Sequence, residues 1–382
     1  MPEFRNRFLL SLKRLNRATH IRELASLFKQ LMLKPRYARQ VLQGLPMVAA
    51  RHLLLGNPIL CVRRYAGIGD IICTFPSLMA LRRTEPTAML IYETRRHNML
   101  LVARSRLVDL VVEEGSPLAW ICQKLFRLKL DLYPLLPDEY TPKRHCERIH
   151  LTEEFRKSFG LPALDGQSAR LEVTAKANKE IFRWLRSTGL SDTPLVVIHT
   201  GPTWKTREWP VEHWIELVMR LRSEFGAAVV QIGQDTFASG EACVSPRAVG
   251  AIDRVGRLTL DQMLALLKVA DLFVGIDSGM LHLAGTVRTS CVGIFGPIDP
   301  SCRLPTSSPA IGVTAQEPCI GCHHNANGPG HWMTGCPHNI RCMSNLTVEE
   351  VFRACSNYLK IPPRTNANEN RNYFVVQSPL GR

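Results

Sequence analysis

The sequence predicts an α/β protein with two halves, each built from a parallel sheet with helices on both faces. One pattern occurs twice: a short apolar run, a turn that contains glycine and a helical stretch fill residues 59–81 and again residues 271–284. Elsewhere, short apolar runs alternate with longer amphipathic stretches, as is typical of parallel sheets. A chain of 382 residues with 45% hydrophobic and 21% charged residues is long enough, and ordinary enough in composition, for two globular domains.

The second copy of the pattern carries the more informative residues. Its apolar run, residues 271–276, predicts a buried strand, and Asp277, Ser278 and Gly279 follow at the start of a predicted helix that contains His282. Free backbone N–H groups and the helix dipole at such a turn attract phosphate. Most junctions of this kind bind nothing, so a plain structural turn, with a buried histidine behind it, is the alternative interpretation.

The first copy places two glycines and an acid at the corresponding point. Residues 59–65 predict a strand, and Gly67 and Gly69 allow the backbone to approach a ligand closely. Asp70 falls at the start of the helix predicted for residues 71–81. Position alone would make Asp70 a helix cap, whereas an acid at the mouth of a sheet also suits catalysis.

The charge of the chain is unusual and uneven. The formal net charge is +15, and residues 1–55 hold eleven Lys or Arg against two Glu, so nine of the excess charges lie there. Leucines at helical spacing between these charges predict a basic amphipathic extension, which would either contact an anionic membrane surface or pack on the first domain. Aromatic residues do not interleave with the basic clusters, so nucleic acid is not an expected partner.

Neither a signal peptide nor a transmembrane run is recognised, so we expect a cytoplasmic protein.

Four of the twelve cysteines have the spacing of metal ligands. They form the series Cys319-x2-Cys322-x13-Cys336-x5-Cys342, and several glycines and histidines lie in the same block, residues 319–342. In a reducing compartment, this spacing favours a tetrathiolate site over disulfides, and zinc is the default metal. A reduced structural knot, or a disulfide formed on oxidation, remains the alternative.

The chain resembles glycosyltransferase family 9, the ADP-heptose:lipopolysaccharide heptosyltransferases and their relatives. The matching pieces come in the family's order: GIGDIICTFPSLMALRR at 67–83, VVIHTGPTWKTREWPVEHWIELVMRL at 196–221, VVQIG at 229–233, LTLDQMLALLKVADLFVGIDSGMLHLAG at 258–285, VGIFGPIDP at 292–300 and the cysteine block. Some autotransporter heptosyltransferases of this family carry a cysteine-bound iron, so the resemblance keeps iron beside zinc.

The resemblance implies the glycosyltransferase B architecture, with two Rossmann-like domains whose parallel sheets face a central cleft. It implies an acceptor domain at residues 56–185, a donor nucleotide-sugar domain at 190–345 that includes the cysteine block, and a helix at 346–360 that crosses back to the first domain. We expect residues 361–382 to form a loose tail, because they show no periodicity.

The resemblance also assigns roles to individual residues. The catalytic aspartate of the family falls on Asp70, which would act as general base. The donor-binding positions are Gly67, Gly69, Thr203, Lys205, Arg207, Asp235, Leu258, Asp277, Ser278, Gly279 and His282. Arg207 stands where the family has lysine, so Lys205 would share or replace its role. Ser278 stands where the family usually has Thr, and either hydroxyl can bind phosphate. Asp235 would hold the ribose, and Leu258, just before the predicted helix cap Thr259, would contact the base.

The expected activity is inverting transfer of a heptose or related sugar from an ADP-linked donor to a lipopolysaccharide core or a similar anionic glycolipid. Transfer would need no metal, because the cations named above can offset the charge of the diphosphate. Peripheral contact with the inner face of the inner membrane would bring the enzyme to such an acceptor. Two alternatives remain: a protein O-heptosyltransferase of the same family, and a non-catalytic relative that binds nucleotide sugars.

Overall fold

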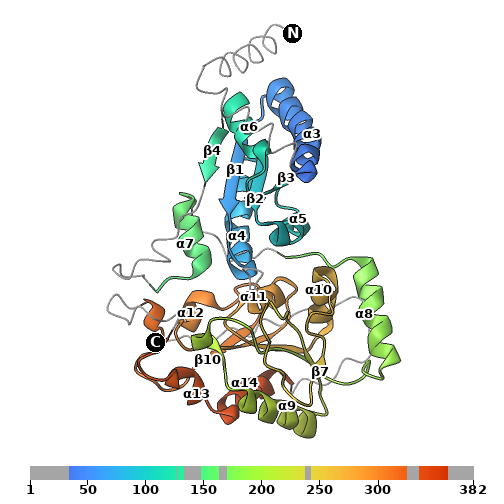
Figure 1. The fold of residues 1–382 in the computed structure, drawn as a ribbon, viewed down its shortest axis with the longest axis vertical. Helices are drawn as coiled ribbons and strands as arrows, with labels where there is room; N and C mark the ends of the chain where they lie inside the picture. The colour runs from blue at the N-terminus through green and yellow to red at the C-terminus, as the bar shows by residue number, and fades with distance from the viewer. Residues whose placement is uncertain are drawn as a thin grey trace.

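The computed structural model describes residues 34–126, 128–132, 148–162, 170–236, 242–324 and 335–359. Within them, two separate sheets form, one with strand order β3-β2-β1-β4 and one with order β10-β9-β8-β5-β6-β7. Every pairing between these named strands is parallel. Figure 1 shows the two halves one above the other, which confirms the predicted α/β class with two parallel sheets.

The first sheet is centred on β1 (Ile59–Arg64), one of the strands that the sequence predicts. Its side chains alternate between two cores. Ile59 and Cys61 pack with helices on one face, whereas Leu60 and Val62 join the core on the other. Burial on both faces explains why the strand is apolar throughout its first four residues.

The other strands of this sheet are β2 (Met89–Thr94), β3 (Leu110–Glu113) and β4 (Leu128–Leu132). The helices of this half are α3 (Pro35–Ala49), η1 (Ala50–Leu54), α4 (Ile68–Thr84), η2 (Arg96–Asn98), α5 (Met99–Ser105), α6 (Pro117–Leu125) and α7 (Leu151–Ser158).

The second sheet places β8 (Leu272–Ile276) between β5 (Leu195–His199) and β9 (Cys291–Ile294). The strand order reverses between β8 and β5, and such a switch point is where open α/β sheets bind ligands, outside the carboxyl ends of the strands. The remaining strands are β6 (Ala228–Gln231), β7 (Ile252–Asp253) and β10 (Ala310–Val313). The helices are α8 (Ala175–Ser187), η3 (Lys205–Arg207), α9 (Val211–Phe225), α10 (Leu260–Val269), α11 (Gly279–Thr286), α12 (Pro300–Arg303), η4 (Cys322–His324), α13 (Arg341–Ser344) and α14 (Val348–Leu359).

Helix α10 begins as the sequence predicts. The Thr259 hydroxyl accepts from the backbone N–H of Gln262, and the Gln262 side chain accepts from the N–H of Thr259, which is a complete capping box. This reciprocal pair satisfies two N–H groups that a helix start would otherwise leave without partners.

The two halves meet through α4 and α11, whose amino-terminal turns face each other. Figure 1 shows α4 reaching down from the first sheet to α11 at the top of the second. One apolar core runs through this junction and includes Phe75 from α4 and Leu281 from α11. At its side, Arg104 of α5 donates two hydrogen bonds to Asp261 of α10, at 2.9 and 2.6 Å. The junction is therefore packed with apolar side chains, and an ion pair at its edge links the two domains.

The structure corrects two expectations about the ends of the domains. The helix expected to cross back to the first domain is α14, and it packs instead on α9 and on strands β8 to β10 of the second. That expectation was wrong because α14 has an apolar face that matches the second core, with Val351 and Phe352 buried there. The boundary expected at residue 185 falls inside α8, which packs on α10 and so belongs with the second sheet.

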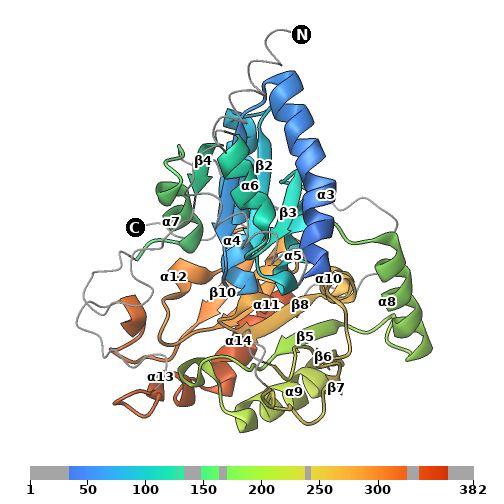
Figure 2. The same cartoon turned by 45° about the horizontal axis from the view of Figure 1, so that its top comes forward.

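The basic extension is described only from residue 34 onward. There, α3 packs on α6 and β3, and Tyr37 and Val48 are buried, so this part of the extension covers the first domain. Figure 2 shows α3 running alongside α6 and β3. Residues 1–33 and the expected tail at 361–382 lie outside the described residues. No helix in the described part of the chain is both long and apolar enough to cross a membrane.

Candidate active site

The turn after β8 has the features of an anion site. Ser278 is the N-cap residue of α11, but its side chain makes no capping hydrogen bond. The Ser278 hydroxyl is buried and has no hydrogen-bond partner among the described residues. A buried hydroxyl without a partner is costly, so it suits a ligand that would accept from it. Together with the start of α11, this hydroxyl offers donors to a phosphate group.

Arg207 reaches this turn from the loop after β5. Its Nη1 lies 3.2 Å from Oδ2 of Asp277 and donates to the Asp277 carbonyl oxygen at 3.5 Å. The other side of the guanidinium is covered by Trp204, whose ring centroid lies 3.7 Å from Cζ. Burial lowers the pKa of Arg207, and the nearby Asp277 opposes that effect. The contact with Trp204 and Asp277 therefore fixes a planar cation beside the turn.

Lys205 does not join Arg207. Its side chain is 80% exposed and pairs with Glu208 at 3.1 Å. Of the two cations that the sequence leaves open, only Arg207 lies beside Asp277. Thr203 lies half-buried in the loop just before η3.

Asp70 lies in the first turn of α4, as the sequence predicts, but it does not cap the helix. The N-cap residue is Gly67. Asp70 Oδ1 instead accepts a hydrogen bond from Arg64 Nη2 at 3.0 Å. Arg64 is almost fully buried, and its guanidinium carbon lies 5.2 Å from the centre of the Phe155 ring. About a third of the Asp70 side chain (31%) is exposed, so a fixed carboxylate remains accessible to a ligand.

The glycines bring the two turns into contact. A Cβ placed on Gly279 would lie 2.9 Å from the backbone nitrogen of Gly69, and a Cβ on Gly69 would lie 2.9 Å from Cδ2 of His282. Gly67 has more space, because its Cβ would meet only Asp70 Oδ2, at 3.8 Å. At Gly69 and Gly279, close approach of the two domains is therefore itself a reason for glycine.

His282 is buried at this contact. Its Nδ1 lies 3.7 Å from Sγ of Cys73, a residue of α4 in the other domain. Burial lowers the pKa of His282 to about 4, so the imidazole is neutral at pH 7. It is both a buried histidine and part of the site, and as a neutral ring it can supply a hydrogen bond but no charge.

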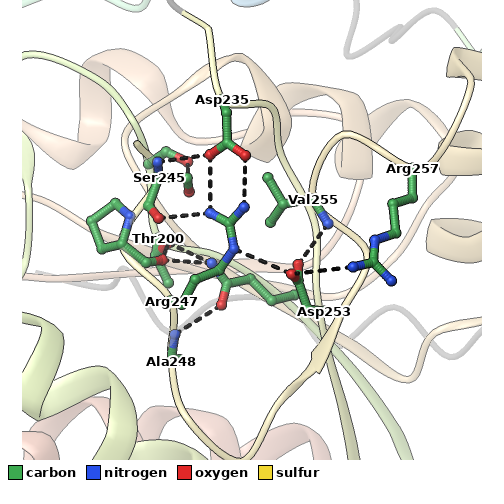
Figure 3. Close-up of polar contacts among 11 residues, drawn as sticks. Thr200, Asp235, Ser245, Arg247, Ala248, Asp253, Val255 and Arg257 are labelled. Atoms are coloured by element: carbon green, nitrogen blue, oxygen red, sulfur yellow. Dashed lines mark hydrogen bonds and ion pairs between the residues drawn. The ribbon is translucent and has the colours of Figure 1, made fainter. Parts of the chain in front are cut away.

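Asp235 follows β6 and belongs to a chain of ion pairs, drawn in Figure 3. Its two oxygens accept from Arg247 at 3.1 and 2.7 Å, and Oδ1 also accepts from the N–H of Ser245 at 2.9 Å. Arg247 donates in turn to Asp253, which lies 4.0 Å from Arg257. A carboxylate has about four lone-pair sites, so Asp235 retains acceptor capacity for one hydroxyl. Leu258, just before α10, packs at the edge of the main core.

All four cysteines expected to bind metal lie in the described part of the chain. Burial raises the pKa of Cys342 to about 12 and that of Cys322 to about 11, and negative charge on the neighbouring cysteines adds to both shifts. Both thiols are therefore neutral at pH 7. Among the described residues, however, no group of three or more His, Cys, Asp or Glu side chains is arranged to hold a metal ion.

Several residues that the sequence did not single out line the same region. Arg303 ends α12, and His324 ends η4, where it is buried. His150 and Cys73 line a small cavity beside His282. Trp204, which covers Arg207, had no local pattern that set it apart. Docking of the two domains brings His150 and Cys73 to this region, whereas Arg303, His324 and Trp204 come from separate loops of the second domain. Spacing along the chain could not have revealed either arrangement.

Comparison with known proteins places this geometry in a family. A model of glycosyltransferase family 9 (heptosyltransferase) matches residues 144–332. The chain belongs to glycosyltransferase family 9. Lipopolysaccharide heptosyltransferase 1 of Pseudomonas aeruginosa is 28% identical over 138 residues, which is 34% of this chain and 36% of that protein. Lipopolysaccharide heptosyltransferase 2 of Salmonella typhimurium is 29% identical over 126 residues, 31% of this chain and 36% of that protein. The alignments thus span about a third of each of these family members.

Solved structures of the family share the fold. The glycosyl transferase family 9 protein of Veillonella parvula superposes with a TM-score of 0.59 at 14% identity, covering 79% of this chain and 97% of that one. The iron-containing dodecameric glycosyltransferase TibC of enterotoxigenic E. coli superposes with a TM-score of 0.61 at 20% identity, covering 79% and 78%. The two facing parallel-sheet domains are therefore the glycosyltransferase B fold, as the sequence implied.

Proposed function

We propose that the chain is an inverting glycosyltransferase that moves a heptose or a related sugar from an ADP-linked donor to a lipopolysaccharide core or a similar anionic glycolipid. One observation carries this proposal: the carboxylate of Asp70 and the anion-binding turn at Ser278 belong to helices whose amino-terminal turns touch, through Gly69 and Gly279. A general base and a site for a leaving diphosphate are the two parts that a single displacement at a sugar carbon needs.

The proposed reaction assigns a task to each part. Asp70 removes the proton from the acceptor hydroxyl as its oxygen bonds to the anomeric carbon. The bond from that carbon to the phosphate oxygen breaks, and the electron pair leaves with ADP. Arg207, Ser278, the amide groups at Gly279 and the neutral His282 hold the diphosphate. One displacement inverts the anomeric centre, and these donors offset the charge without a metal ion.

Support for the donor comes from the family and from structures in it. The curated relatives are heptosyltransferases, TibC has been solved with ADP-D-beta-D-heptose, and E. coli WaaC has been solved with ADP. We propose that Asp235 and Leu258 hold the ribose and the base, and that Thr203 and Gly67 border the diphosphate. The positive net charge favours an anionic acceptor and supports peripheral contact of a cytoplasmic enzyme with the inner face of the inner membrane.

The test is to replace Asp70 with Asn and to follow two quantities separately. We expect Asp70→Asn to lose nearly all sugar transfer from ADP-heptose, because the general base is gone, while calorimetry finds ADP bound as tightly as by the wild type. Asp70→Glu is a second variant, expected to keep some transfer because it keeps the carboxylate. Loss of ADP binding in Asp70→Asn would make the residue structural and would count against the mechanism.

We also propose a structural metal ion, zinc or iron, at Cys319, Cys322, Cys336 and Cys342. The proposal rests on the metal-ligand spacing of these four cysteines, and on the iron of TibC. The thiols would have to draw closer than they lie here to share one ion. Metal analysis of protein purified without chelator should give about one metal ion per chain, and Cys336→Ser should remove it. Metal-free protein with normal stability would rule the ion out.

A further inference from the structure

Arg303 is held at the domain junction from both sides. It is the last residue of α12, the short helix that Asp299 caps. Arg148 of the first domain donates to Asp299 at 3.2 Å. On the other flank, the Nε2 of His150 lies 2.7 Å from the carbonyl oxygen of Leu304. Two contacts with the first domain therefore fix the turn that carries Arg303.

In the described part of the chain, the charge of Arg303 lacks an acidic partner. Four other arginines of the junction lie within 3.2 Å of a carboxylate: Arg64 with Asp70, Arg207 with Asp277, Arg148 with Asp299 and Arg104 with Asp261. Among the described residues, Arg303 has no such ion pair, and its Nη1 donates only to the neighbouring carbonyl of Cys302, at 3.0 Å. The residue is half-buried, and a cation partly removed from water without an anion is unfavourable. Such a group is suited to an anionic ligand.

The same charge reaches the residues of the proposed donor site. Burial, with smaller contributions that include the positive charge of Arg303, lowers the pKa of His282 to about 4. Arg303 also contributes, after burial, to the lowered pKa of Arg207. The fold agrees with this, because Pro305, two residues after Arg303, lines the same small cavity as His282 and His150.

His324 adds an independent sign of a missing ligand. The side chain is 4% exposed, and both ring nitrogens are buried without a hydrogen-bond partner among the described residues. A neutral imidazole always carries one N–H donor, which here has nothing to accept it. Among the described residues, the imidazole N–H of His324 has no acceptor and the guanidinium of Arg303 has no carboxylate partner. A negatively charged ligand with several hydrogen-bond acceptors would satisfy both groups.

We propose that Arg303 binds the diphosphate of the nucleotide-sugar donor and offsets the charge that grows on it as the sugar leaves. This rests on the proposed function. Arg207 has less net charge to offer the diphosphate, because Asp277 already offsets part of it. When the bond between the anomeric carbon and the phosphate oxygen breaks, the electron pair stays on the diphosphate. Arg303, whose charge is not offset by an acid, stabilises that product, and His324 donates beside it.

The experiment compares Arg303→Met and Arg303→Lys with a matched control, Arg222→Met. Arg222 also donates to a carbonyl, that of Gly250 at 2.9 Å, but it lies on α9, away from the junction. Calorimetry with ADP and with adenosine separates binding of the diphosphate from binding of the nucleoside. We expect Arg303→Met to weaken ADP binding about 10- to 100-fold, the usual range for a charged hydrogen bond. Adenosine binding should stay unchanged, Arg303→Lys should lose less, and Arg222→Met should behave as wild type.

Other outcomes overturn the inference in distinct ways. If the wild type binds ADP and Arg303→Met binds it equally well, Arg303 does not contact the diphosphate, although the proposed function stands. If only the KM for the acceptor rises, Arg303 holds an acceptor anion instead. If the wild type binds no ADP and transfers no sugar, the proposed function fails and this inference fails with it. Thermal unfolding shows whether each variant is folded, and Arg303→Lys supplies the measurement if Arg303→Met is not.

Discussion

Gly69 and Gly279 meet backbone to backbone across the two domains. A Cβ on Gly279 would lie 2.9 Å from the nitrogen of Gly69 and 3.0 Å from the Cβ of Ile68. Neither glycine is among those with a positive φ, so no special backbone conformation requires them. What requires them is the approach of α4 and α11, which brings Asp70 near the turn at Ser278. The geometry of the site and the packing of the domains thus depend on the same two residues.

Gly279→Ala should therefore separate the two turns. The added methyl has no space against backbone atoms, and such overpacking typically costs about 1–3 kcal/mol. We expect a lower melting temperature and loss of sugar transfer, because the general base would move away from the donor. Gly335→Ala is the control, since a Cβ there meets nothing within 4 Å. Wild-type activity and stability in Gly279→Ala would show that the junction is looser than this contact implies.

Arg64 should position Asp70 for catalysis without binding the donor. Arg64 is the last residue of β1, and its Nη2 donates a hydrogen bond to Asp70 Oδ1 at 3.0 Å. Arg64→Met frees the carboxylate to rotate, so we expect kcat to fall about 10-fold or more while the KM for the donor is unchanged. Arg64→Lys should restore part of kcat. The control is Arg63→Met, which breaks a similar ion pair, to Glu93 at 2.9 Å. It should lower stability yet keep kcat. Equal losses of kcat in both variants would make the role of Arg64 merely structural.

How far the sequence predicted the site depends on whether a residue's role is local. Asp277, Ser278 and Gly279 follow a buried strand, so their place at the edge of the sheet could be read from the pattern. The choice between Lys205 and Arg207 could not, because it depends on Trp204 covering one of them. Arg303 and His324 were missed for a related reason. The turn that carries Arg303 is placed by contacts with the first domain, and the unpartnered ring nitrogens of His324 become evident only in the folded chain. No spacing along the chain encodes either feature.

Acid should destabilise the folded chain through its buried histidines. Burial lowers the pKa of His199, His282 and His324 to about 4 and that of His323 to about 3, against 6.5 for a free side chain. The unfolded chain therefore binds more protons than the folded one between these values. The stabilisation is complete above pH 6.5 and is lost as the pH falls toward 4.

Urea unfolding measured from pH 8 to pH 4.5 checks this expectation. The free energy of unfolding should be nearly flat above pH 7 and should then fall, with each buried histidine contributing up to about 1.4 kcal/mol per pH unit. His199→Gln should reduce that slope, because His199 is buried and its hydrogen bond among the described residues is with the Ile232 carbonyl oxygen, 3.1 Å from its Nδ1. A slope unchanged by the substitution would mean that His199 is not among the groups that resist protonation.

Asp235 offers a test of how the donor ribose is held. Arg247 and the N–H of Ser245 fix its carboxylate and leave capacity for one more hydrogen bond. If a ribose hydroxyl takes that place, the wild type should bind ADP more tightly than 2′-deoxy-ADP or 3′-deoxy-ADP, and Asp235→Asn should reduce that preference. We expect the loss to be about 1–2 kcal/mol, as for a hydrogen bond to a charged group. Arg247→Met should reduce the preference less, since it disturbs the position of the carboxylate but leaves it in place. Equal affinities for all three nucleotides in the wild type would instead make the chain of ion pairs from Asp235 to Arg257 a brace for the loop after β6.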